Sequence, residues 1–254
     1  MPCYRNCPGI DYSGAGGPQQ RLTGIRCFRA SSGQEPIELL DDGAFWSRAS
    51  LYQHLRRWIS ESGPLLIGVD HGFSFPYAYF EAHGLSSWRE ALDDFLKHWP
   101  TDRCSVQSLR SNCHDQKRQG DARWRRETEK RASAKSVFHF DVPGSVAKST
   151  HAGLPWLLKL KMEFGSRLHV WPYDGLEPPA GVSVILETYP ALWSGSLKDS
   201  VPLDLGPDQR DAFVVAKRLM HADEADLLKV WFAHPASRLP PQQIALEGWI
   251  LGVD

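Results

Sequence analysis

The sequence has no long apolar run and no excess of charge of either sign. No segment approaches the roughly 18 consecutive apolar residues of a membrane span, and no apolar stretch follows a basic start at the N-terminus. The 29 Lys and Arg nearly balance the 30 Asp and Glu. This balance excludes a globally basic nucleic-acid-binding protein, so any nucleic-acid surface has to be a local patch. We expect a soluble, untargeted protein that does not bind membranes.

Cysteines are few, odd in number and irregularly spaced. A chain of this length is not a small disulfide scaffold, and the spacings lack the paired short intervals of a zinc ribbon or finger. Reduced thiols and a cytoplasmic location are therefore expected. The five residues are Cys3, Cys7, Cys27, Cys104 and Cys113.

The 254 residues, 42% of them hydrophobic, predict a single α/β domain over 1–254. Residues 77–150 differ from the rest, because they hold few aliphatic side chains, scattered aromatics and a basic stretch. We interpret this region as an insertion. Elsewhere, short β-compatible runs predict strands and apolar residues at helical spacing predict helices. The expected strands are the approach to Asp11, 21–30, 36–40, 65–69, 167–175 and 182–186, and the expected helices are 47–63, 153–165, 205–220 and 222–234.

Acidic residues stand at the ends of three apolar strands. Asp11, Asp70 and Glu187 occupy these positions, and a later helix opens with Asp208 and Asp211 one turn apart. Because active sites of parallel α/β sheets lie at the carboxyl ends of the strands, these acids can converge. Carboxylate oxygens suit Mg²⁺ or Mn²⁺, and two such ions can activate water and stabilise the leaving oxygen in phosphodiester cleavage. The pattern therefore indicates a metal-dependent hydrolase.

Each acid also has a structural interpretation. Asp11 and Asp70 precede glycine-containing turns, where Asp is common. Asp208 follows a proline and suits a helix N-cap, with Asp211 three residues on and favourable to the helix dipole. Glu187 fits a turn poorly, and a carboxylate at the edge of a core needs a partner. The occurrence of all of them at element ends favours a shared site.

Six stretches in this order resemble a known family. They are GIDYSGA, IGVDHGFSFP, VWPYDG, ETYPAL, DQRDAFVVA and EGWILGV, and they are similar to the predicted nucleases of domain-of-unknown-function family 429, in the ribonuclease H-like superfamily. The resemblance implies an RNase H-like fold: a five-stranded mixed sheet with strands 1–3 antiparallel, flanked by helices.

The resemblance also implies roles for the acids. In the superfamily an Asp on the first strand and an acid on the fourth bind divalent metal, and a further acid enters from the last core helix. The matching residues are Asp11, Asp70 and Asp211, with Asp208 beside them. Glu187 falls in the family's Glu-x-Tyr-Pro motif, as ligand or base. We therefore expect catalysis by Asp11, Asp70, Glu187 and Asp211, and Mg²⁺ or Mn²⁺ as cofactor.

The basic stretch 117–135 is a candidate nucleic-acid surface. Arginines interleaved with an aromatic ring can hold phosphates and stack a base. The alternative is a solvated helix with Arg–Glu pairs four residues apart. The candidate contacts are Arg123, Trp124, Arg125, Arg126 and Lys130.

Three functions remain open on the sequence. A metal-dependent nuclease acting on DNA or RNA accounts for the acids. An actin-like phosphotransferase would use DYSGAGG as an acid followed by a phosphate-binding turn, although such enzymes usually need two copies of the fold. A non-catalytic nucleic-acid- or protein-binding module would keep the acids for folding alone.

Overall fold

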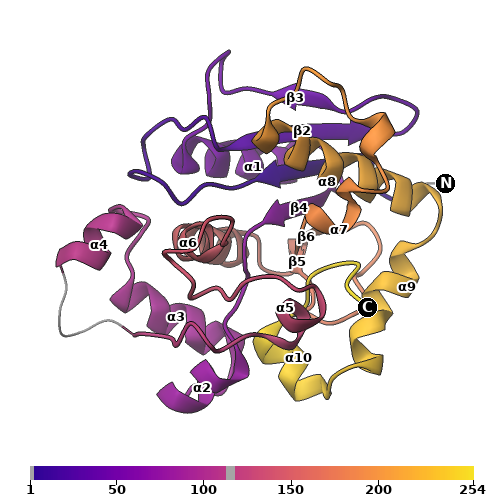
Figure 1. The fold of residues 1–254 in the computed structure, drawn as a ribbon. Coiled ribbons are helices and arrows are strands. Elements are labelled where there is room, and N and C mark those ends of the chain that lie inside the picture. The colour runs from indigo at the N-terminus through magenta and orange to yellow at the C-terminus, as the bar shows by residue number, and fades with distance from the viewer. Residues whose placement is uncertain (1–2, 113–117) are drawn as a thin grey trace.

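The structure is a computed structural model that describes residues 3–112 and 118–254. These residues form one six-stranded mixed sheet in the order β3-β2-β1-β4-β6-β5, with helices around it (Figure 1). The strands are β1 (Asn6–Asp11), β2 (Arg26–Ser31), β3 (Ile37–Leu39), β4 (Leu66–Asp70), β5 (Leu168–Val170) and β6 (Ser183–Glu187).

The strand directions divide the sheet into two halves. β1, β2 and β3 pair with one another antiparallel, whereas β4, β6 and β5 continue in parallel from β1. The α/β class is confirmed, and the first three strands pair as expected. The sheet has the six strands that the residue patterns predict, one more than the family resemblance implies, because β5 pairs with β6 at the edge.

The two faces of the sheet carry different helices, as alternation along each strand requires. Ile10, Val69 and Ile185 face one core, together with leucines of α1 and α6. Leu186 faces the other core, together with Phe213 and other residues of α8. The long helices are α1 (Arg48–Glu61), α6 (Ala147–Phe164) and α8 (Pro207–Glu224).

Two paired glycines bring α8 close to the sheet. Gly9 on β1 lies opposite Gly68 on β4. A Cβ atom at Gly9 would lie 2.3 Å from the backbone of Ala212 and Ala216, and one at Gly68 would lie 2.6 Å from the Val215 side chain. Because no side chain separates them, the first half of α8 rests directly on β1 and β4.

The inserted region contributes helices that pack beside α6. Its interior is aromatic rather than aliphatic: Phe95, Trp99 and Phe138 contact the buried imidazole of His151 on α6. The helices are α2 (Tyr77–His83), α3 (Trp88–His98), α4 (Val106–Asn112) and α5 (Glu127–Arg131).

The inserted region is also tied to the last helix. The backbone N–H groups of Tyr77 and Glu127 donate to the two carboxylate oxygens of Glu247, at 2.6 and 3.0 Å. The remaining helical segments are η1 (Gly165–Arg167), α7 (Ala191–Ser194), η2 (Lys198–Ser200), α9 (Leu228–Ala233), η3 (His234–Ser237) and α10 (Pro241–Glu247).

Cys3, Cys7, Cys27 and Cys104 are free, and Cys113 lies outside the described residues. In the described part of the chain, no helix combines the length and apolar character needed to cross a membrane.

Candidate metal-binding site

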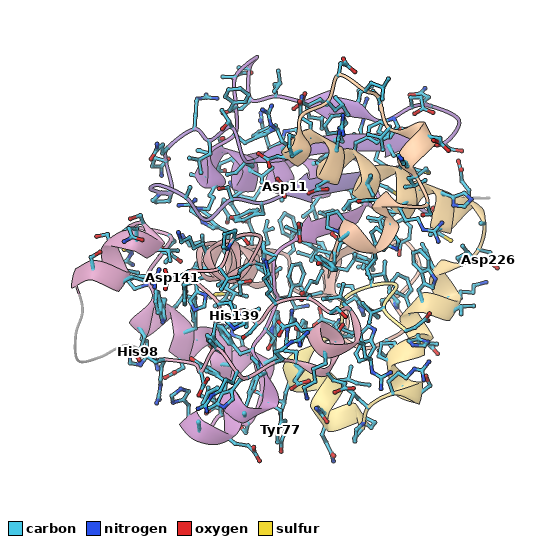
Figure 2. The ribbon with its side chains drawn as sticks, viewed as in Figure 1. Asp11, Tyr77, His98, His139, Asp141 and Asp226 are labelled. Carbon is cyan, nitrogen blue, oxygen red and sulfur yellow. The ribbon has the colours of Figure 1, made fainter. Side chains whose placement is uncertain are left out.

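Asp11 and Asp70 lie side by side on the face of the sheet that α8 covers. They are direct partners in the parallel pairing of β1 with β4, and each is the last residue of its strand. Each comes two positions after a glycine that contacts α8, so both side chains point to the side of α8. Asp11 lies near the end of the sheet where α8 begins (Figure 2).

The first turn of α8 brings two more carboxylates to this edge. Asp208 is exposed and Asp211 is half-buried. The N-cap is Gly206, whose N–H donates to the side-chain oxygen of Gln209 at 3.0 Å. Asp208 is therefore not the N-cap that the sequence suggested, and its carboxylate is not used to cap the helix.

Burial and mutual repulsion raise the pKa of these carboxyls. Burial, with the charges of Asp208 and Asp211, raises the pKa of Asp11 to about 8. Burial, with Asp11, Asp211 and Glu187, raises the pKa of Asp70 well above its usual value. Burial and the charge of Asp208 raise the pKa of Asp211. The carboxylates are thus close enough to influence one another's protonation.

The acids have no cationic partner in the described residues. No Lys, Arg or His of 3–112 or 118–254 forms an ion pair with Asp11, Asp70, Asp208 or Asp211 within 4.0 Å. Arg26, whose charge lowers the pKa of Asp11, is itself paired with Glu38 at 3.0 Å. Like charges gathered at a partly buried edge are unfavourable unless a cation joins them. The donor set and its charge therefore suit a divalent cation.

Glu187 lies on the opposite face of the sheet. It pairs with Val69 rather than with Asp70, one step out of register with the aspartates. Its carboxylate is buried, accepts two hydrogen bonds from the Arg126 guanidinium at 2.7 and 2.5 Å, and accepts a third from the Phe73 N–H at 2.9 Å. The partner that the sequence required is this arginine, and Glu187 is not brought to the aspartates as a ligand.

Three of the candidate nucleic-acid contacts are turned inward. Arg126 is fully buried and also bonds Glu129 through Nε at 2.8 Å. Arg125 donates to two backbone carbonyls, one of them that of Glu129. Trp124 is partly buried and packs edge-on against Phe138. These side chains hold the inserted region together and do not present a phosphate-binding surface.

The other two candidates are exposed and paired with acids. Arg123 bonds Asp121 at 2.5 Å, and Lys130 lies 3.5 Å from Glu127. Exposed ion pairs of this kind are weak, so both cations could still bind a polyanion. The structure thus retains only Arg123 and Lys130 as surface cations of that set.

The glycine-rich loop after Asp11 packs against other parts of the chain. Arg48 donates to the carbonyls of Ser13, Ala15 and Gly16 at 2.7 to 3.0 Å. A Cβ atom at Gly14 would lie 2.1 Å from the backbone of α6. The small residues therefore allow α6 to approach the loop closely.

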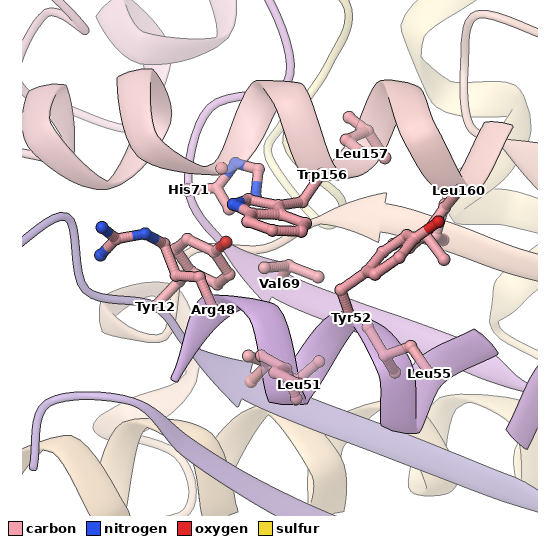
Figure 3. A pocket seen from close by; sticks show the side chains of 13 residues that line it. Tyr12, Arg48, Leu51, Tyr52, Leu55, Val69, His71, Trp156, Leu157 and Leu160 are labelled. Carbon is pink, nitrogen blue, oxygen red and sulfur yellow. The ribbon is translucent and has the colours of Figure 1, made fainter. Parts of the chain in front are cut away.

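A small pocket lies on the face away from the aspartates. Tyr12 and His71, which directly follow Asp11 and Asp70, line it together with Arg48 and Trp156 (Figure 3). Its volume of about 30 Å³ leaves space for roughly one water molecule. Burial lowers the pKa of His71 to about 4. This pocket is too small for a nucleotide.

A larger groove adjoins Asp211 at the start of α8. It has a volume of about 610 Å³, which is in the usual range for small-molecule sites. Lys198 and Arg210 place positive charge on its wall, and Leu203 and Val214 supply apolar surface. Of the candidate acids, Asp211 lines this groove of substrate size, and Asp199 adds a second carboxylate to its wall.

No group of three or more His, Cys, Asp and Glu side chains forms a ready-made metal site in residues 3–112 and 118–254. The aspartates converge on one edge, but their side chains are not arranged around a common point. Metal binding by them remains a prediction.

Comparisons with protein-family models, with curated proteins and with solved structures found no match to this chain. The functional argument therefore rests on the residues and their geometry.

Proposed function

We propose that this protein is a divalent-metal-dependent nuclease with an RNase H-like fold. The observation that carries the proposal is the pair Asp11 and Asp70, which lie in register on one face of the sheet. Asp208 and Asp211 on α8 accompany them, and none of these acids has a cationic partner among residues 3–112 and 118–254. Hard oxygen ligands of this number favour Mg²⁺ or Mn²⁺.

The order of the elements supports the fold assignment. Three antiparallel strands lead into the parallel strand β4, and α8 packs across β1 and β4 as the last long helix. This is the arrangement that the resemblance to the ribonuclease H-like superfamily implies. The sixth strand and the helices of the inserted region are additions to it.

The chain's own residues have distinct tasks in this proposal. Asp11, Asp70 and Asp211 would hold the cation, with Asp208 at the exposed side. Side-chain rotations would have to bring these carboxylates around one point, and binding would release the proton that Asp11, with a pKa of about 8, retains near neutral pH. The bound cation would supply an activated water and neutralise charge on the scissile phosphate.

The groove beside Asp211 would hold the substrate backbone. Lys198 and Arg210 on its wall provide the positive charge that a polyanion needs close to an acidic centre. Arg210 is already oriented, because its guanidinium donates to the carbonyls of Leu203 and Leu205. DNA or RNA is therefore the proposed substrate.

The test is cleavage of single-stranded and duplex DNA and RNA with Mg²⁺ or Mn²⁺. We expect metal-dependent cleavage by the wild type and a loss of about a hundredfold or more in Asp70→Asn, because a metal ligand is removed. Asp226→Asn is the matched control, since Asp226 is exposed and far from Asp11 (Figure 2). Equal activity of wild type and Asp70→Asn would contradict the assignment.

Two other results would favour the other functions. Thermal stabilisation by ATP, without cleavage of any polymer, would support a phosphotransferase. Nucleic-acid affinity that is unchanged by removal of Mg²⁺, again without turnover, would support a binding module.

A further inference from the structure

Thr188 continues the row of aspartates onto a third strand. It directly follows Glu187 at the end of β6, and its N–H donates to the carbonyl of Val69 at 3.0 Å. Since Val69 is the pairing partner of Glu187, the next positions along the two strands are Asp70 and Thr188. Asp11, Asp70 and Thr188 therefore occupy neighbouring positions on β1, β4 and the end of β6.

The side chain of Thr188 lies on the same face as the aspartates. Successive residues of a strand point to opposite faces, so Thr188 points away from the side of Glu187 and Arg126. A Cβ atom at Gly68 would lie 2.8 Å from Cγ2 of Thr188 and as close to Leu219 of α8. Thr188 is thus packed under α8, beside the strand that ends in Asp70.

The hydroxyl of Thr188 is buried and has no hydrogen-bond partner in the described residues. The residue is 2% exposed, and Oγ1 is among the buried polar atoms without a partner. A buried hydroxyl without a partner destabilises a fold, and valine would fill the same volume without that cost. An unpaired hydroxyl on the face of the acidic residues is available to donate to a neighbouring carboxylate if that carboxylate changes its orientation.

We propose that Thr188 is a positioning residue for Asp70 in the metal site, an inference that rests on the proposed function. Its hydroxyl donates a hydrogen bond to the Asp70 carboxylate in the metal-bound site, and so fixes the orientation of the carboxylate. Hydrogen bonds of this kind to metal-ligating carboxylates raise metal affinity. The hydroxyl also satisfies its own hydrogen-bonding capacity in that state.

The test compares wild type with Thr188→Val and Thr188→Ser in Mn²⁺ binding, measured by isothermal titration calorimetry, and in the melting temperature of the metal-free protein. Thr188→Val should weaken Mn²⁺ binding by about tenfold. It should also melt a few degrees higher without metal, because the unpaired hydroxyl is gone. Thr188→Ser keeps the hydroxyl and should bind Mn²⁺ within about twofold of the wild type.

The outcomes separate this inference from the nuclease proposal. If Thr188→Val is folded and binds Mn²⁺ as tightly as the wild type, Thr188 does not position Asp70. If the wild type binds no Mn²⁺, the metal site and the role of Thr188 both fail. If wild type and Thr188→Val differ in Mn²⁺ affinity as expected but the wild type cleaves no nucleic acid, the nuclease proposal fails and Thr188 keeps its role.

Discussion

A shift of one residue in strand register gives Asp70 and Glu187 different environments. Glu187 pairs with Val69, and both side chains point to the α6 side of the sheet, where Glu187 meets Arg126. Asp70 is the next residue after Val69, so it points to the α8 side and meets other acids. Both are acids at the ends of apolar strands. Their opposite orientation means that one belongs to a buried ion pair and the other to a candidate metal site.

The ion pair of Arg126 with Glu187 should be essential for stability. Arg126→Met leaves the buried carboxylates of Glu187 and Glu129 without their cation, and we expect it to lower the free energy of unfolding by about 3–5 kcal/mol. Urea denaturation followed by circular dichroism would measure the change. Arg126→Met/Glu187→Leu should recover part of the loss. Arg123→Met is the matched control, since Arg123 is exposed, and should leave stability unchanged. A fully stable Arg126→Met would contradict this account.

The sequence predicts the residues of the site better than their surroundings. Glu187 was expected to need a partner because it suits neither a turn nor an exposed surface. The identity of that partner could not be predicted, because Arg126 lies 61 residues away in a stretch where all the cations look alike. Whether a basic residue is buried depends on tertiary packing, which no local pattern in 117–135 encodes.

At the level of elements, contact between α8 and the sheet determines where Asp211 lies. Gly9→Ala should disturb that contact, because its Cβ atom would lie 2.3 Å from backbone atoms that cannot rotate away. We expect a loss of about 1–3 kcal/mol in the free energy of unfolding. Mn²⁺ affinity should also fall, since Asp211 moves with α8.

The control for Gly9→Ala is Gly17→Ala. Gly17 has open space around its Cβ position, so alanine should affect neither stability nor Mn²⁺ binding. Thermal denaturation with and without Mn²⁺ would measure both effects. Wild-type behaviour of Gly9→Ala would show that α8 is not held at this distance by the glycine pair.

Element types were more predictable than element ends. The apolar pattern of 205–220 predicts the helix α8, but its start was misassigned because Asp208 is a common N-cap residue. Pro207 suits the first helical position, and the Gln209 side chain accepts from the N–H of the N-cap Gly206. Helix α6 begins at Ala147, before the expected 153, where the Ser145 side chain accepts from the Ala147 N–H.

For the whole molecule, the raised carboxyl pKa values predict an unusual pH dependence. A carboxyl whose pKa is higher in the folded protein than in the unfolded chain stabilises the fold at low pH, and this contribution is lost as the pH rises through the folded value. For Asp11 the window runs from about 4 to about 8. Burial lowers the pKa of His71 and His151 to about 4 and 3, which has the opposite effect, but only below about pH 6.5.

The metal-free protein should therefore lose about 1–2 kcal/mol of its free energy of unfolding between pH 6.5 and 8. Urea denaturation at several pH values in the presence of a chelator would measure this loss. Asp11→Asn should show a flatter profile, because one of the titrating groups is removed. A wild-type profile that rises over this interval would contradict the predicted repulsion among the acids.

The α/β class of the fold was predictable, whereas the helices within residues 77–150 and their packing were not. Alternating strand and helix patterns predict α/β, and acids at strand ends predict the edge where a site lies. Residues 77–146 gave no such signal because their core is aromatic, with rings such as Phe95 and Trp99 packed around His151 rather than aliphatic residues at regular spacing.

The bonds between the inserted region and the rest of the chain limit how that region could be exchanged for another. Arg126 neutralises Glu187 on β6, and the N–H groups of Tyr77 and Glu127 hold the carboxylate of Glu247 on α10. Loss of the region would leave the buried carboxylates of Glu187 and Glu247 without these partners. A chimaera in which a shorter connection replaces the region would therefore have to change Glu187 and Glu247 as well.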